Sequence, residues 1–343
     1  MATDADLLLR TAMTPGLDLS AALAFAAKRR TAAMVVLHRG EIAAEHYLMG
    51  WDAHVPAPLT SVSKSIVAAL VGILLQQRLL EDVALPVTAW LPEWRDDPRG
   101  AITLRMLLNM TSGLRNPPLW RLALRGNRGL GLDLGLAHPP GTHWEYNTAA
   151  YRLLFTICER ASGLGMRELC QRELFDPLGM RHTRWLLRRA GEAGGDGTES
   201  EEVVNIAASP LDLARFGQLV LQRGVWLGRE LVAPTYFDEA LHASQPHNPT
   251  YGYLFWLNRG PKRLFPDAPE DTVAAMGARY CRLFVIPSLE LVVVRTGERA
   301  ALAGEAIGKR SGNQQTFDNQ LLRLIAGAVE PVASDVDDAV GKM

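Results

Sequence analysis

A serine and a lysine that stand three residues apart offer the first candidate chemistry in this sequence. Ser61 and Lys64 lie in LTSVSKSIVAALVGILL, at the start of a run that is apolar on nearly every side. Such a run is typical of a buried helix, which we expect from Ser61 to Leu80. A spacing of i and i+3 puts both side chains on one helical face, with Cβ atoms roughly 5 to 6 Å apart. The amine can then accept the hydroxyl proton, which would make Ser61 a nucleophile.

Lysine is scarce in this chain, and its scarcity gives Lys64 its weight. Lysine stands only at positions 28, 64, 262, 309 and 342, whereas lysine and arginine together number 36. A serine that opens a helix is more often a structural N-cap, so the serine alone predicts little. What lysine offers over arginine is an amine that can act as a base in a buried site. The pair therefore favours acid/base chemistry over capping.

The start of the expected helix supplies a further catalytic element. Its first backbone N–H groups lack helical partners, and its dipole is positive at this end, beside the place where a tetrahedral oxyanion would form. Ser63 and Ser65 are expected on other sides of the helix. We therefore assign the role of nucleophile to Ser61.

The motif SVSK and the segments around it resemble the serine β-lactamase and DD-peptidase superfamily, whose signature is S-x-x-K at a helix start. Matching blocks follow in the order of that superfamily: LLEDVALPVTAWLPEW, ITLRMLLNMTSGL, PPGTHWEYNTAAYRLL, ELFDPLGMRHT and ASPLDLARFGQLVLQRGVW. They cover most of the span from Ser61 to Asn258, and WEYN with NPTYGYLFWLN is closest to the esterase-like and 6-aminohexanoate-dimer-hydrolase-like branch. The resemblance implies cleavage of an ester or amide through an acyl-enzyme.

The resemblance also implies a second acid/base residue, in a Tyr-x-Asn or Tyr-x-Ser motif that matches Tyr146, Asn147 and Thr148. Tyr146 would exchange protons with Lys64, because an adjacent ammonium stabilises a phenolate. Thr148 stands where many relatives carry Asn or Ser. Its hydroxyl can still bind Lys64 or the substrate, but it lacks the dual donor and acceptor character of an amide.

Tryptophans near this motif are candidates for an apolar substrate pocket. Trp144 precedes the tyrosine by two residues, and Trp120 and Trp256 lie in neighbouring blocks. Core packing is the usual role of a buried tryptophan, so each of these side chains has a structural alternative.

The third element of the superfamily, Lys-Thr-Gly or His-Thr-Gly on a strand facing the serine, aligns best with residues 275–277, which read AMG. Gly277 would let the backbone approach the substrate closely. The N–H of Ala278 would join the N–H of Ser61 as the oxyanion hole. The assignment of these two N–H groups as oxyanion donors follows from the resemblance and from this alignment of the third element.

The cation of the third element is missing here, which weakens recognition of a β-lactam or D-Ala carboxylate. Arg279 and Arg282 are candidates to replace it, and we expect Arg279 to contact substrate. Because strand residues alternate between faces, at most one of them need point toward the serine. The expected substrate is therefore a neutral small-molecule ester or amide.

The elements that must position these residues predict an α+β fold of the β-lactamase/DD-peptidase type. A hairpin is expected within 31–51, strands at 251–258, 278–287 and 289–297, and a closing helix at 320–329. Residues 1–81 and 223–343 would form a mixed, mainly antiparallel sheet flanked by helices. Residues 82–222 would form an inserted all-helical lobe, in which Pro and Gly residues separate the helical segments. The active site would lie in the cleft between the two parts.

Composition narrows the possible partners. Lysine and arginine (36) balance aspartate and glutamate (37), so no overall field attracts nucleic acid or an anionic membrane. The longest apolar run, 66–75, is about half of what spans a bilayer. The histidines show no metal-binding spacing, so no metal or other cofactor is expected. Three cysteines without CxxC spacing, and a first segment unlike a signal peptide, predict a cytoplasmic protein. The oligomeric state is left open.

Two other functions remain open from the sequence. A transacylase would form the same acyl-enzyme and pass the acyl group to an amine or alcohol in a biosynthetic pathway. A non-catalytic binding protein would keep the fold with an inactive site, an alternative that the altered third motif suggests and that Ser61, Lys64 and Tyr146 argue against.

Overall fold

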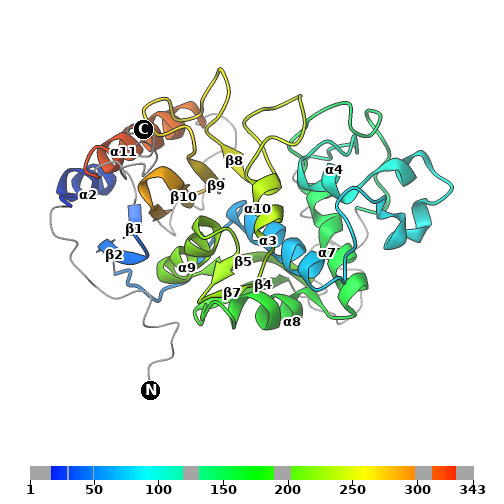
Figure 1. Cartoon of the computed structure of the whole chain (residues 1–343), viewed down its shortest axis with the longest axis horizontal. Helices are drawn as coiled ribbons and strands as arrows, with labels where there is room; N and C mark the ends of the chain where they lie inside the picture. The colour runs from blue at the N-terminus through cyan, green and yellow to red at the C-terminus, as the bar shows by residue number, and fades with distance from the viewer. Residues whose placement is uncertain are drawn as a thin grey trace, which may run out of the picture.

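A six-stranded sheet lies in the left half of the molecule as drawn in Figure 1. The computed structural model describes residues 17–28, 31–48, 50–118, 131–188, 202–297 and 311–329. The strand order is β2-β1-β11-β10-β9-β8, and each neighbouring pair is antiparallel. The strands are β1 (Thr31–His38), β2 (Glu41–Tyr47), β8 (Trp256–Leu257), β9 (Val273–Met276), β10 (Arg282–Ile286) and β11 (Leu291–Gly297). Strands from both ends of the chain thus meet in one sheet, as the sequence predicts.

The expected hairpin is confirmed and turns tightly. Arg39 and Gly40 connect β1 and β2, and both have positive φ, 54° and 81°. Two consecutive residues of this kind match the twist of a two-residue hairpin turn. The connection between β10 and β11 is the 3-10 turn Pro287–Leu289, followed by Glu290 in the left-handed region.

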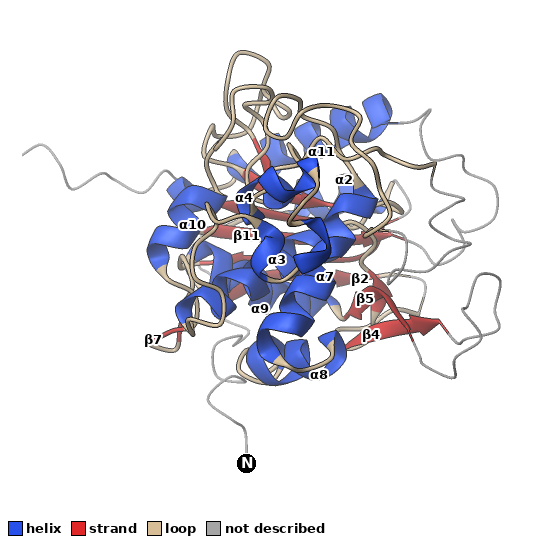
Figure 2. Cartoon of the chain, turned by 90° about the vertical axis from the view of Figure 1, so that its right-hand side faces the viewer, coloured by secondary structure: helices blue, strands red, loops and turns tan. Residues whose placement is uncertain are grey.

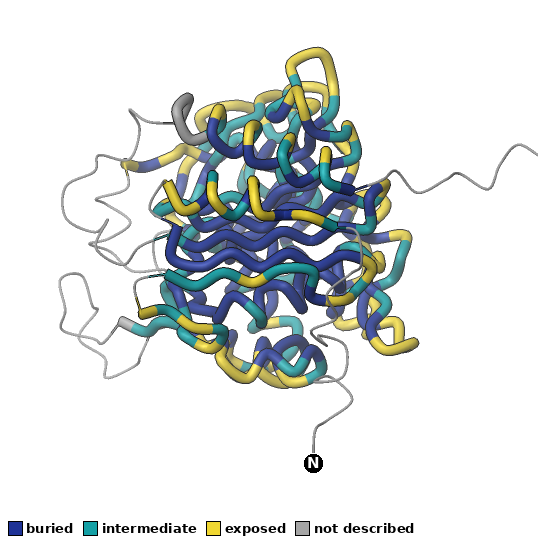
Figure 3. Tube along the Cα trace, turned by 90° about the vertical axis from the view of Figure 1, so that its left-hand side faces the viewer, coloured by how far each residue is buried: buried dark blue, intermediate teal, exposed yellow. Residues whose placement is uncertain are grey.

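The two faces of the sheet bury separate cores. Val35 and Leu37 of β1 pack on one side, whereas Met34 and Val36 pack on the other, because successive strand residues point to opposite faces. The second face is covered by α2 (Ser20–Ala27) and α11 (Ser311–Ala326), which lie together in Figure 1. Figure 3 shows the buried strands as a middle layer between more exposed segments.

The first face of the sheet carries the predicted central helix. This helix, α3, runs over Val62–Gln76 and is buried along nearly its whole length. It ends earlier than the expected Leu80, because Arg78 adopts a positive φ of 58° that no helix continues. Figure 2 shows α3 beside α7 (Thr148–Ser162), with which it makes direct contacts.

The segment 82–222 is not helical throughout, which corrects the expected all-helical lobe. It holds the short helices α4 (Leu104–Leu108) and α8 (Met166–Cys170), the 3-10 turns η1 (Val87–Ala89), η2 (Pro92–Trp94) and η3 (Pro98–Ala101), and the π turn η4 (Gln171–Phe175). It also holds strands β4 (Thr183–Arg188) and β5 (Glu202–Ala208), which form a three-stranded sheet with β3 (Ala57–Pro58). β-branched and aromatic residues in both strands favour this pairing.

The last helix of that segment belongs spatially to the large sheet. α9 (Pro210–Leu221) begins at the N-cap Ser209 and contacts β11, β10 and β1. It buries residues around most of its circumference, as a helix between other layers must. The domain boundaries at residues 81 and 222 stay a prediction. The remaining elements are β6 (Val225–Trp226), β7 (Arg229–Glu230) and α10 (Pro234–Ala240).

The structure bears on two further expectations, the lack of a membrane-spanning helix and the state of the cysteines. In the described ranges, no helix is both long and apolar enough to cross a membrane. The three cysteines, Cys158, Cys170 and Cys281, are buried free thiols. Burial raises the pKa of each thiol well above its ordinary value, so these side chains serve as small apolar groups.

Candidate active site

Ser61 sits at the N-cap of α3 without acting as a cap. Its backbone has helical dihedrals, φ −73° and ψ −10°, and its side chain makes no capping hydrogen bond. Capping serines usually adopt an extended backbone that turns the hydroxyl toward the helix N–H groups. The preceding Thr60 has a φ of 51°, a strained value for a β-branched residue. The Ser61 hydroxyl is therefore free of the structural role that its position suggests.

Lys64 is the hydrogen-bond partner of that hydroxyl. Its Nζ lies 3.2 Å from Ser61 Oγ, while the lysine side chain is buried with 4% exposure. The same Nζ lies 5.0 Å from the ring centre of Tyr146 and 4.9 Å from that of Tyr151. Aromatic faces attract an ammonium electrostatically. No carboxylate within the described ranges forms an ion pair with Lys64, so the amine faces the serine and two phenol rings.

The other two serines of the motif are committed elsewhere, as expected. Ser63 Oγ donates to Asn205 Oδ1 at 2.6 Å, and Ser65 Oγ donates to the carbonyl of Leu254 at 2.6 Å. These bonds tie α3 to β5 and to the segment before β8. Of the three hydroxyls, that of Ser61 is the one next to Lys64.

The loop that carries Tyr146 is fixed by its neighbour Asn147. Asn147 is the N-cap of α7, and its Oδ1 accepts from the N–H groups of Ala149 and Ala150, both at 3.0 Å. Its Nδ2 donates to the carbonyl of Leu114 at 2.9 Å. The sequence interpretation missed this role, although an asparagine directly before a helical pattern is a recognisable cap signal.

Thr148 is the first residue of α7 and is half-buried. Within the described residues it makes no hydrogen bond to Lys64. Its expected contact with substrate stays a prediction.

Aromatic rings extend from Tyr146 toward the sheet. Trp256 stacks on Tyr146 with ring centres 5.9 Å apart, and Tyr251 meets Tyr146 edge-on at 6.1 Å. Trp144 meets Tyr251 at 5.4 Å and Trp256 at 6.2 Å, so it joins the same aromatic group. Its indole N–H is buried without a hydrogen-bond partner in the described part of the chain. Trp120 lies outside the described residues.

Two tyrosines of this region were missed by the sequence interpretation. Tyr151 and Tyr251 are almost fully buried, and burial raises the pKa of each well above the ordinary value of a phenol. They therefore stay neutral at physiological pH, beside a lysine amine and Tyr146. Both tyrosines lie in segments that carry the family resemblance, PPGTHWEYNTAAYRLL and NPTYGYLFWLN, but neither belongs to a catalytic motif.

Gly277 lies directly against the chain that leads into α3. A Cβ at this position would overlap the carbonyl oxygen of Leu59 and Oγ1 of Thr60. Thr60 Oγ1 also donates weakly to the carbonyl of Ala278, at 3.4 Å. The glycine is thus required by a close backbone approach, and the turn after β9 reaches the residues on either side of Ser61.

Two backbone donors are left unused at this junction. Within the described ranges, the N–H groups of Ser61 and Ala278 donate to no protein acceptor. Unpartnered N–H groups at a helix start and on an adjacent turn can stabilise an anion. These are the two N–H groups that the family resemblance predicts for the oxyanion hole.

The candidate replacements for the missing cation differ in position. Arg279 is half-exposed, with a φ of 57°, and its carbonyl packs against Gly297 at the end of β11. Arg282 is buried at 5% exposure and binds Asp318 of α11, on the opposite face of the sheet from α3. Arg282 therefore does not replace the cation beside the serine, and a substrate contact of Arg279 stays a prediction.

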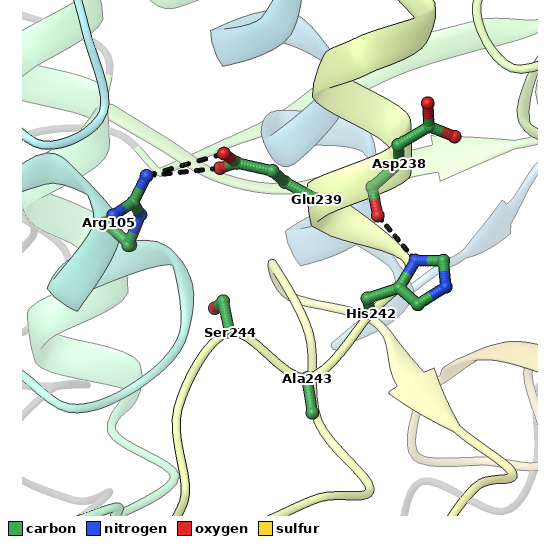
Figure 4. A pocket seen from close by; sticks show the side chains of 6 residues that line it. All are labelled: Arg105, Asp238, Glu239, His242, Ala243 and Ser244. Carbon is green, nitrogen blue, oxygen red and sulfur yellow. Dashed lines mark hydrogen bonds and ion pairs between the residues drawn. The ribbon is translucent and has the colours of Figure 1, made fainter.

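A separate surface pocket lies between α4 and α10 (Figure 4). It has a volume of about 440 Å³ and contains none of the predicted site residues; its lining is Arg105, Asp238, Glu239, His242, Ala243 and Ser244. Arg105 is held by Tyr253 and Glu239. Figure 4 shows His242 turned to the carbonyl of Asp238 and away from Ser244, so no serine and base are paired there.

Comparisons with known proteins bear on the fold. The family model named Beta-lactamase matches residues 9–310. Penicillin-binding protein 4* of Bacillus subtilis (strain 168) is 31% identical over 142 residues, which are 38% of this chain and 31% of that protein, so the match spans about a third of that relative.

Solved structures share the architecture at low identity. A Bacillus anthracis protein provisionally named a 6-aminohexanoate-dimer hydrolase has a TM-score of 0.69 at 18% identity, covering 89% of this chain and 82% of that one. EstCE1, a hydrolase with promiscuous acyltransferase activity, has a TM-score of 0.64 at 16% identity, covering 89% and 97%. At this identity the likeness shows the fold alone, and it confirms the expected β-lactamase-like α+β architecture.

Proposed function

Because this chain belongs to the beta-lactamase family, within the superfamily of serine acyl-transferring hydrolases, we propose that it cleaves a small ester or amide through an acyl-enzyme on Ser61. One observation carries the proposal. The Ser61 hydroxyl makes no capping bond and lies 3.2 Å from Nζ of Lys64. A nucleophile within hydrogen-bond reach of a buried amine is the arrangement that acyl transfer needs.

The proton path of the proposal uses the residues around Lys64. Ser61 Oγ attacks the carbonyl carbon, and its proton passes to Lys64 with Tyr146 as the second acid/base group. The leaving alcohol or amine then receives a proton from the same pair. Water repeats the sequence on the acyl-enzyme and releases the acid. The position of the Tyr146 ring against Nζ of Lys64 supports this pairing.

The oxyanion of the tetrahedral intermediate would be bound by the N–H groups of Ser61 and Ala278. Their lack of protein acceptors in the described ranges supports this role, as does the close approach of Gly277 to Thr60. Donors that are already oriented contribute strongly because they need no reorganisation during the reaction.

The proposed substrate is neutral on its acyl side. The third motif has Ala275 where relatives place a cation, and Arg282 is engaged by Asp318 on the far face of the sheet. The aromatic group of Trp144, Tyr251 and Trp256 beside Tyr146 offers apolar surface instead. We place the reaction in the cytoplasm, an assignment that the three free, buried cysteines support.

Steady-state hydrolysis of para-nitrophenyl acetate tests the proposal. Ser61→Ala should lower kcat by about 10³-fold or more, since the nucleophile is removed. The matched control is Ser63→Ala on the same helix, whose hydroxyl binds Asn205 and not Lys64. This control should lose stability but keep most of its activity. Equal hydrolysis by wild type and Ser61→Ala would refute the assignment.

A transacylase is the second candidate, because the structural neighbour EstCE1 is a hydrolase with promiscuous acyltransferase activity. Analysis of the acyl products of the same reaction, with a primary alcohol added at millimolar concentration, separates a hydrolase from a transacylase. A hydrolase should still release mainly acetate, whereas a transacylase should form mainly the new ester. A binding protein without catalysis would show neither product.

A further inference from the structure

A buried charged cluster lies behind the turn that carries Ala278. Arg282 Nε donates to Asp318 Oδ2 at 2.6 Å, and Arg295 Nη1 donates to Asp318 Oδ1 at 3.3 Å. The side chains of all three are no more than 6% exposed. Burial of charged groups costs desolvation free energy, and even paired charges add little net stability to the fold. We therefore looked for a role of this cluster other than stability.

The Arg282 guanidinium reaches past Asp318 to the backbone of the turn. Its Nη1 donates to the carbonyl oxygens of Gly277 and Cys281, the latter at 2.9 Å. Gly277 N–H donates to the same Cys281 carbonyl at 2.8 Å, which closes the turn. Arg282 thus fixes the start and the end of the loop between β9 and β10.

The geometry of one peptide bond links this contact to the site. The carbonyl of Gly277 and the N–H of Ala278 belong to the same peptide unit, and in a trans peptide these groups point in opposite directions. Arg282 binds the carbonyl from the α11 side of the sheet. The N–H therefore points away from Arg282. Gly277 meets Leu59 and Thr60 at the start of α3, and Thr60 Oγ1 donates to the carbonyl of Ala278 at 3.4 Å, so this peptide lies beside Ser61.

The charge of Arg282 also acts through that bond. A hydrogen bond from a guanidinium to an amide carbonyl draws electron density toward the oxygen and makes the N–H of the same amide a stronger donor. A donor that is both oriented and polarised is what an oxyanion hole requires.

We propose that Arg282, held by Asp318, is a positioning residue that orients and polarises the Gly277–Ala278 peptide, so that the Ala278 N–H binds the developing oxyanion at Ser61. The inference rests on the proposed function. Arg282 would then be a cation that acts on the oxyanion through the peptide bond, from the α11 side of the sheet. Relatives instead carry a cation within the third motif. Among the described residues Arg282 makes no hydrogen bond to Ser61, and the proposal assigns it no contact with the substrate.

Replacement of the carbonyl oxygen of the substrate by sulfur tests this role. Wild type should hydrolyse para-nitrophenyl acetate faster than its thiono analogue, because sulfur accepts hydrogen bonds from an oxyanion hole poorly. In Arg282→Lys and Arg282→Met, kcat/KM for the oxo ester should fall about 10- to 100-fold, within the range seen when an oxyanion donor is weakened. The thiono ester should lose much less, so the oxo/thiono ratio should drop about tenfold.

Arg295→Met is the matched control. Arg295 shares Asp318, binds Thr31 Oγ1 at 2.9 Å and lies over the Tyr280 ring of the same turn at 5.1 Å, but among the described residues it does not donate to the Gly277 carbonyl. It should lower the melting temperature without changing the oxo/thiono ratio. Asp318→Asn should lower the ratio in the same direction as the Arg282 variants. Rates are compared per active molecule, counted by fluorophosphonate titration, so partial unfolding does not enter the ratio.

An unchanged ratio in Arg282→Lys and Arg282→Met would overturn the inference while leaving the proposed function intact. An equal drop in Arg295→Met would also overturn it, since the effect would then be general to the cluster. If Arg282→Met does not fold, Arg282→Lys decides, because it keeps a buried cation for folding but replaces the planar fork that joins Asp318 to the Gly277 carbonyl by a single ammonium. Absence of hydrolysis in wild type would overturn the proposed function and this inference together.

Discussion

At the scale of single residues, the side chain of Lys64 determines what Ser61 can do. The helical dihedrals of Ser61 keep its hydroxyl from the capping position, and the amine of Lys64 takes the place of a capping N–H as its partner. Tyr146 and Tyr151 cover the amine with their ring faces. An arginine there would keep a cation and a donor but could not accept a proton.

Exchange of Lys64 therefore separates charge from basicity. Lys64→Arg and Lys64→Met should each lower kcat for para-nitrophenyl acetate by about 10²- to 10⁴-fold, the usual contribution of a general base. Lys28→Arg, at the exposed end of α2, is the control and should match wild type. Circular dichroism melts verify folding. Full activity in Lys64→Arg would mean that Lys64 supplies charge only, which would rule out its role as a base.

At the scale of elements, the packing of α3 is tighter than its sequence suggests. Gly72 lies in the middle of the helix, where an alanine usually adds stability. Here a Cβ would stand 2.7 Å from Tyr236 Cδ1 and 2.7 Å from Val232 Cγ1. Tyr236 also donates to the carbonyl of Ala68 at 2.6 Å, so its ring cannot easily withdraw.

Gly72→Ala should therefore destabilise the protein, opposite to the effect expected from helix propensity. We expect a loss of about 1 to 3 kcal/mol, typical of overpacking in a core. Urea unfolding measures the change, and the pair Gly72→Ala with Tyr236→Phe shows whether the hydroxyl anchor resists the shift. A variant as stable as wild type, or more stable, would show that α10 moves aside freely.

The elements that could be predicted from sequence are those that local patterns specify. The hairpin of β1 and β2, the helix behind Ser61, and the strands β10 and β11 follow from apolar periodicity and turn residues. The β4 and β5 pair was missed because the intervening residues contain a long Gly-rich segment and the surrounding pattern is helical. The local pattern, and not the distance along the chain, separates the two groups, because β1 and β11 pair from opposite ends of the chain and β4 and β5 are neighbours in sequence.

At the scale of the whole molecule, the candidate site is assembled from segments far apart in sequence. α3 brings Ser61 and Lys64, the loop before α7 brings Tyr146, and the turn after β9 brings Ala278. The family resemblance predicted each of these residues separately. It could not show that Arg282 binds Asp318 of α11, because that contact joins residues 36 positions apart and forms only when α11 packs on the sheet.

The same limit holds for the residues that only support the site. Tyr151 and Tyr251 carry no chemistry that a motif would mark, and their roles appear once α7 and the segment before β8 are in place. Specificity depends on such neighbours, and their sequence alone carries no code for it.

Peptide mapping of a covalent adduct tests the central claim, that Ser61 is the nucleophile, most directly. Wild type incubated with a fluorophosphonate should gain one adduct, located by mass spectrometry on the peptide that contains Ser61. The adduct should persist in Ser63→Ala and be absent in Ser61→Ala. No adduct on wild type, or an adduct on another residue that Ser61→Ala retains, would contradict the account.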